Sequence, residues 1–152
     1  MGRDHLHTLT SVNNLCLLLQ DQGKLSLAMP LLRRTLVGCE RTLGCDHPHT
    51  LSAFNNLGLL LQAQGKISLA DTFFRRALEG RERTLGRDHP DTLTSVNNLG
   101  SLLQDLGNLS LAEPFLRRAL EGCERTLGRD HPHTLKSVNN LRDLLKAMEK
   151  EK

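Results

Sequence analysis

The chain has 152 residues, a formal net charge of +3, 38% hydrophobic residues and only 3% aromatic residues. This length suits one compact domain or a short array of repeats. The weak positive charge is spread along the chain and few aromatic side chains are present for bases to stack on, so nucleic-acid binding is not expected. No apolar run reaches the roughly 20 residues of a membrane span and no secretory signal opens the chain, so we expect a cytoplasmic protein without membrane contact.

The sequence repeats itself with a fixed period of 42 residues. Each of the four copies opens with Asp-His and continues with a shared Thr-Leu and a shared Asn-Asn-Leu. A period of about 20–50 residues is typical of solenoids and helical arrays. We therefore expect a single array over residues 1–152. Its predicted parts are three repeats at about 4–45, 46–87 and 88–129, followed by a capping helix at about 130–150.

Three glycines stand at equivalent places in the second half of the first three repeats, namely Gly38, Gly80 and Gly122. The surrounding pattern is helical, and a glycine inside a helix costs about 1 kcal/mol relative to alanine. Two explanations stay open at this point. Either the missing side chain lets a neighbouring helix approach closely, or the helix bends or ends early there.

The first half of the third repeat predicts a helix from Pro90 to about Asp105. Gly86 ends the preceding helix, Asp88 or His89 provides the N-cap, and proline is well suited to the first helical turn. Apolar residues then recur at spacings of three and four, which indicates one buried stripe. That stripe consists of Leu93, Val96, Leu99, Leu103 and Leu106.

The second half of the same repeat predicts another helix, from about Leu111 to Leu127. Gly107 ends the first helix, and Ser110 lies three residues before Glu113, which matches a capping box. The connection is so short that the two helices must be antiparallel. The paired arginines that recur in each repeat, such as Arg117-Arg118, are expected on the solvent-exposed side.

The fourth copy predicts only one helix, from Pro132 to about Lys150, with a polar outer face. A polar terminal helix is what a solenoid needs at its end. The expected fold class is therefore all-α. It is a right-handed α-solenoid of antiparallel helix hairpins, with three hairpins and a C-terminal capping helix.

The spacing of Leu99-Gly100, Leu103, Gly107, Ala112, Leu116 and Ala119 resembles that of the tetratricopeptide repeat. The usual repeat has 34 residues. The 42-residue form, with its Asn-Asn-Leu and Arg-Arg-Ala-Leu-Glu, is similar to the repeats of kinesin light chains and nephrocystin-type proteins. The resemblance covers the whole chain. It implies a non-enzymatic scaffold or adaptor that binds an extended peptide or a partner helix in a concave groove lined by the first helix of each repeat.

By repeat register, the groove would be lined by small polar side chains and by a ladder of asparagine pairs. An asparagine amide both donates and accepts hydrogen bonds, so it can pair with the backbone of a bound peptide. We expect one asparagine of each pair to hold the stack together and the other to face the groove. The predicted groove residues are Asn13, Asn14, Gln20, Asn55, Asn56, Gln62, Thr94, Asn97, Asn98, Ser101, Gln104, Asn139 and Asn140.

Three alternatives to this function remain. In the first, the chain is a fragment of a larger repeat protein with no partner of its own; in the second, it self-associates as a homo-oligomer through the ends of the array. The third is metal binding by His47-Pro-His49 and His131-Pro-His133, but the third repeat has Asp91 at the second position, so we expect these histidines to cap helices. No motif for catalysis, phosphate binding or a cofactor is found.

The four cysteines, Cys16, Cys39, Cys45 and Cys123, form no CxxC pair, and only Cys39 and Cys123 stand at equivalent places in the repeat. A disulfide framework or a zinc site would need a regular spacing. We therefore expect free thiols, no metal site and a reducing compartment.

Overall fold

The computed structural model describes residues 30, 33, 34, 37, 38, 41, 44 and 46–151, and the predicted first hairpin lies almost entirely outside them. Between residues 46 and 151 the chain forms helices and turns, with no strand. The chain divides into two compact units, residues 1–80 and 81–152. The helices are α3 (Pro48–Ala63), α4 (Ile67–Leu85), α5 (Pro90–Asp105), α6 (Leu109–Leu127) and α7 (Pro132–Lys150).

The first helix of each described repeat begins with the same histidine cap. Nδ1 of His47, His89 and His131 accepts a hydrogen bond from the backbone N–H two residues later, at 3.1–3.2 Å. A proline occupies the first helical turn in all three helices, where its missing N–H needs no partner. Of the two caps that the sequence left open, the histidine is therefore the one used.

The turn between α5 and α6 depends on Gly107, whose φ of +83° is unfavourable for any residue with a Cβ. The N–H of Asn108 donates to the carbonyl of Leu103 at 2.9 Å, which closes a Schellman-type helix end. The carbonyl of Asn108 already accepts from Ala112, so α6 begins at Leu109. The predicted capping box at Ser110 is therefore wrong, because that residue already lies inside the first turn.

The mid-helix glycines mark close helix contacts. A Cβ added at Gly80 would lie 2.4 Å from Leu51 Cδ2, and one added at Gly122 would lie 2.6 Å from Leu93 Cδ2. The alternative of an early helix end is wrong, because α4 and α6 continue five residues past these glycines. The close-approach explanation is therefore correct, because a leucine of the neighbouring first helix occupies the space that a Cβ would need.

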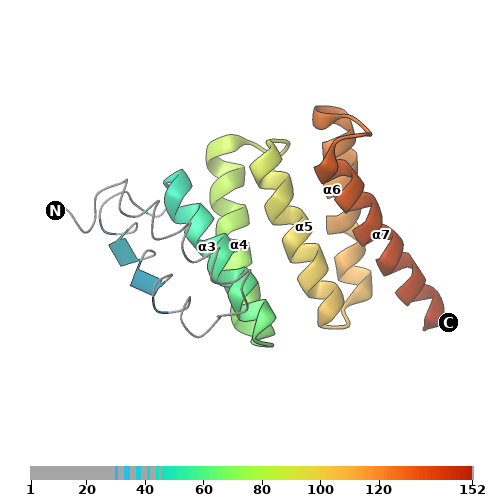
Figure 1. Ribbon diagram of the computed structural model, residues 1–152, viewed down its shortest axis with the longest axis horizontal. Coiled ribbons are helices and arrows are strands. Elements are labelled where there is room, and N and C mark those ends of the chain that lie inside the picture. Colours follow the sequence, from blue (N-terminus) through green and yellow to red (C-terminus); the bar gives the residue numbers. More distant parts are fainter. Residues whose placement is uncertain are drawn as a thin grey trace. The chain divides into compact units, whose positions relative to one another are not determined.

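Within residues 81–152, α6 packs against both α5 and α7, and α5 also contacts α7. Figure 1 shows α6 running antiparallel to these two helices. The predicted stripe of α5 is buried from Leu93 to Leu103, whereas Leu106 at its end is 43% exposed. The predicted all-α repeat architecture is confirmed, and Leu102 joins the core although it stands outside the predicted stripe.

The paired arginines of α6 differ from each other. Arg117 lies on the solvent-exposed side as expected and forms an ion pair along the helix, with Glu113 at 2.8 Å. Arg118 is partly buried and reaches Glu82 at the end of α4, also at 2.8 Å. The prediction of a purely solvated arginine face is therefore wrong for the second arginine, which connects two helices.

Candidate functional site

The face of α5 opposite the leucine stripe carries the predicted groove residues. Thr94 and Ser101 are half-buried, and Asp105 at the end of the helix is exposed. Asn98 lies between them and is 9% exposed. Thr94 donates its hydroxyl to the carbonyl of Pro90 at 3.0 Å, so this hydroxyl already has a partner.

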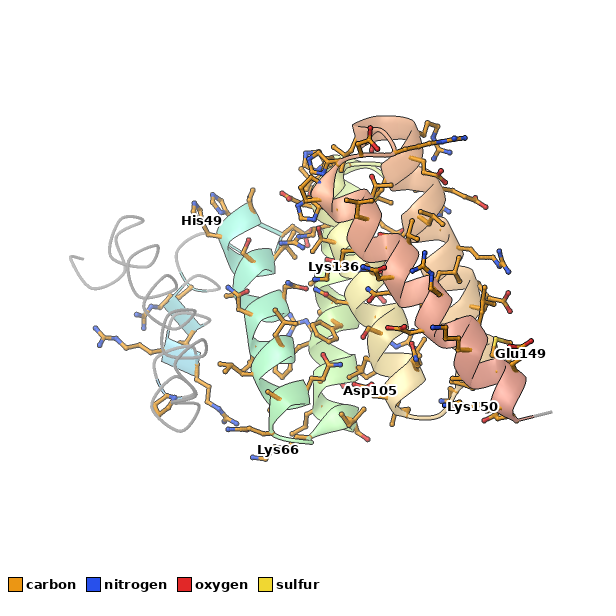
Figure 2. All side chains as sticks on the ribbon, turned by 45° about the vertical axis from the view of Figure 1, so that its right-hand side comes forward. His49, Lys66, Asp105, Lys136, Glu149 and Lys150 are labelled. Carbon is orange, nitrogen blue, oxygen red and sulfur yellow. The ribbon has the colours of Figure 1, made fainter. Side chains whose placement is uncertain are left out.

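The equivalent face of α7 is more open to solvent. Lys136 and Asp143 are exposed, and Asn140 is half-buried. Figure 2 shows Lys136 on the side of α7 next to α5 and Asp105 near the opposite end of α5. We call Thr94, Asn98, Ser101, Lys136, Asn140 and Asp143 the polar face of α5 and α7.

The two asparagines of each pair have different surroundings. Asn97 is 6% exposed and lines a small cavity between α5, α6 and α7, whereas its equivalent on α7, Asn139, is exposed. In the first unit, Asn55 and Asn56 on α3 are both buried. The remaining predicted residues Gln62 and Gln104 are half-buried, and Asn13, Asn14 and Gln20 lie outside the described residues.

Arg81 is a buried cation that the sequence pattern did not single out. Its Nη1 donates to the carbonyl of Asp91 at 3.1 Å and to Ser95 Oγ at 2.8 Å. Burial lowers the pKa of Arg81, and the Asp91 carboxylate opposes this shift. The signal was present in the sequence, since this arginine stands where the neighbouring repeats have Cys39 and Cys123.

Cys123 occupies the equivalent place one repeat later, where it is a buried free thiol. Its Sγ lies 3.8 Å from Ser137 Oγ, which corresponds to Ser95 in the third repeat. Burial raises the pKa of the Cys123 thiol, so the thiol form is favoured over the reactive thiolate.

The His-x-His pairs are arranged for helix capping. The rings of His131 and His133 stack with their centroids 5.2 Å apart, and Nδ1 of His131 is already used by the cap. The described residues contain no group of three or more histidine, cysteine, aspartate or glutamate side chains close enough to hold a metal ion. Burial, and secondarily the neighbouring His49, lower the pKa of His47.

A larger groove of about 720 Å³ runs along the other side of α7, against α6. Its floor is apolar and its edges carry charges of both signs. The residues that line it are Glu113, Leu120, Val138, Leu141, Arg142, Leu145, Lys146, Met148 and Glu149.

Comparison with known proteins assigns the repeats. The family model described as "Tetratricopeptide repeat" matches residues 7–83, 55–122 and 91–152. A search of curated proteins finds no match. No helix in the described part of the chain has the length and apolar character needed to cross a bilayer.

Solved structures with the same fold include kinesin-light-chain repeats. Nearly identical TPR-like repeats of a kinesin light chain from Podosopora anserina share 26% identity, with a TM-score of 0.78 over 97% of this chain and 70% of that one. A variant form of the same repeats has 24% identity and a TM-score of 0.80, covering 97% and 69%. BtubC (BKLC) from P. vanneervenii has 22% identity and a TM-score of 0.81, covering 93% of this chain and 56% of that one.

Proposed function

The chain belongs to the tetratricopeptide repeat family, and we propose on this basis that it binds an extended peptide or a partner helix along its first helices, as a scaffold or adaptor. The family and the kinesin-light-chain-like neighbours support a protein-interaction repeat module in general. The observation that carries the finer proposal is the polar face of α5 and α7. It presents solvent-accessible groups from both helices on one side.

The chemistry of this face fits a peptide backbone. The amide of Asn140 is half-buried, which limits its freedom while leaving it accessible. It can donate to a peptide carbonyl and accept from a peptide N–H. The charged neighbours Lys136 and Asp143 would then select among peptide side chains by charge. The equivalent positions of α5 are the uncharged Thr94 and Ser101, so this charge selection would be confined to α7.

A peptide-library selection against the purified protein tests this proposal. The key variant is Asn140→Ala. Its matched control is Asn139→Ala, which removes the same amide group from the preceding residue, on a different side of the helix. Loss of a peptide hydrogen bond worth about 1 kcal/mol lowers affinity roughly fivefold. We expect that loss for Asn140→Ala alone. Equal affinities for both variants, or no enriched peptide from folded protein, would contradict the proposal and favour a piece of a larger repeat protein with no partner of its own.

A second candidate function is self-association through the groove between α6 and α7. Two copies of α7 packed antiparallel would place Leu145 against its own copy and Leu141 near Met148 of the other copy, in one apolar stripe. The same pairing, centred on Leu145, places Arg142 near Glu149 of the other copy, which gives complementary charges. We expect light scattering to show a dimer that Leu145→Glu converts to a monomer. A monomeric unmodified protein at high concentration would contradict this function.

For both candidates we propose a cytoplasmic location, which the free thiols expected from the cysteine pattern support. The single described cysteine, Cys123, is a free thiol.

A further inference from the structure

A small cavity of about 40 Å³ lies between α5, α6 and α7 at the edge of the polar face. Its walls include Thr94 and Asn97 from α5, Cys123 from α6, and Lys136 and Ser137 from α7. Figure 2 shows that Lys136 stands next to α5 at this place. A water molecule needs about 10–15 Å³ of such volume, so the cavity takes a group of about three non-hydrogen atoms.

One residue of the cavity wall carries a polar atom without a partner. Asn97 is 6% exposed, and its Oδ1 is buried without a hydrogen bond. Buried acceptors are nearly always paired in folded proteins, so this oxygen indicates that a donor is missing. The nearby Ser137 hydroxyl has only a long contact of 3.8 Å with Cys123 Sγ, and this sulfur is a weak acceptor.

The preceding repeat shows one side chain that can fill this place. There the side chain of Arg81 occupies the position equivalent to Cys123 and is 7% exposed. Its guanidinium donates to Ser95 Oγ, the equivalent of Ser137. The short side chain of Cys123 cannot reach as far. A space for a polar head group is therefore left open beside the polar face.

The surrounding charges decide which head group fits. Asp91, which supports the guanidinium of Arg81, is replaced by His133 at the next repeat, and Thr94 is replaced by Lys136. With the acid lost and a base gained, a guanidinium or ammonium group would be repelled. A carboxylate would place a negative oxygen against Asn97 Oδ1. A carboxamide avoids both problems, because its NH₂ donates to Asn97 and its oxygen accepts from Lys136 or Ser137.

We propose that this cavity binds the side-chain carboxamide of an asparagine or glutamine in the peptide held on the polar face. The inference rests on the proposed function, since the peptide is what delivers the side chain. It makes the Cys123 cavity a specificity pocket for one residue of the ligand. A carboxamide contains three non-hydrogen atoms, which matches the volume.

Two variants of Cys123 distinguish the loss of the pocket from the loss of the fold. Cys123→Met fills the cavity from within by a longer, uncharged side chain that Lys136 does not repel, and is expected to fold. Cys123→Ser keeps the cavity open and is the matched control. In the peptide selection, we expect enrichment of asparagine or glutamine at one position for the unmodified protein and for Cys123→Ser. Cys123→Met is expected to lose that preference and about tenfold in affinity for the selected peptides.

Formamide provides a probe that does not depend on the peptide. We expect saturable NMR shift changes at the Asn97 side-chain amide and at Ser137 in the unmodified protein, and none in Cys123→Met, at concentrations that leave circular dichroism unchanged. Formamide binding without any enriched peptide would support the pocket and overturn the proposed function. Enriched peptides without a carboxamide preference, or no formamide response, would overturn the pocket and leave a site for water only.

Discussion

At the scale of single residues, the histidine caps determine where the first helices begin, and the mid-helix glycines allow neighbouring helices to pack closely. A cap through Nδ1 requires that this nitrogen has no proton, since a protonated imidazole has only donors. The same cap recurs at His47, His89 and His131. At these three positions the cap therefore needs an imidazole without a proton on Nδ1.

We predict that acid weakens the start of α3 through His47. Its folded pKa is lowered below the ordinary value of 6.5 by burial and by His49. A lowered pKa means that the neutral form stabilises the fold, fully above pH 6.5, and that this contribution is lost as the pH falls from 6.5 through the folded pKa. Urea unfolding between about pH 7.5 and 5 measures it. His47→Asn retains a cap that does not titrate, so its stability should fall less over the same range; equal slopes would contradict the assignment.

We predict that Gly58→Ala destabilises the first unit. A Cβ at this position would lie 2.6 Å from Cε1 of Phe74, whose rigid ring is fully buried. Overpacking of this kind costs about 1–3 kcal/mol, which outweighs the roughly 1 kcal/mol that alanine gains in helix propensity. Thermal unfolding reports the change. Phe74→Leu in the same chain should recover part of the loss, and simple additivity of the two changes would argue against a clash.

At the scale of elements, α6 is held by the contact of Leu93 at Gly122 and by selected arginines that reach beyond the helix. Arg118 of α6 reaches Glu82 of α4, and Arg125 reaches Asp88 at 2.8 Å in the loop before α5. Arg117 stays within its own helix. The side chain of Arg118 is 21% exposed, against 50% for that of Arg117. Two neighbouring arginines therefore differ in role: one forms an ion pair within its own helix and the other connects two helices.

We predict that Arg118→Met lowers the free energy of unfolding by about 1 kcal/mol, because a partly buried charge pair is screened less than an exposed one. Arg117→Met is the matched control, and its loss should be about 0.3 kcal/mol, as for other exposed pairs along a helix. Denaturant titrations at low and high salt give both values. The Arg118 contribution should change less with salt, and a reversed order of the two variants would contradict this account.

At the scale of the whole molecule, periodicity predicted the elements well and their contacts poorly. The bounds of α5 and α7 agree with the expected Pro90–Asp105 and Pro132–Lys150, because proline, glycine and leucine spacing act locally. The start of α6, the cation at Arg81 and the cavity beside Asn97 were not predicted. The start of α6 follows from the backbone turn at Gly107 and Asn108. The cation and the cavity depend on side chains from neighbouring helices, and one sequence does not state which of these face each other. The groove residues themselves remain a prediction.

The packing of helices on their neighbours in the sequence also bears on how fast the chain folds. In residues 81–152 every helix contact joins α5, α6 and α7 to the next helix or the next but one. Only short loops must close before such contacts form, so the entropy of chain closure is small. Helical proteins with mainly local contacts refold within microseconds to milliseconds. We therefore expect residues 81–152 to recover from unfolding on that timescale, before diffusing copies meet and aggregate.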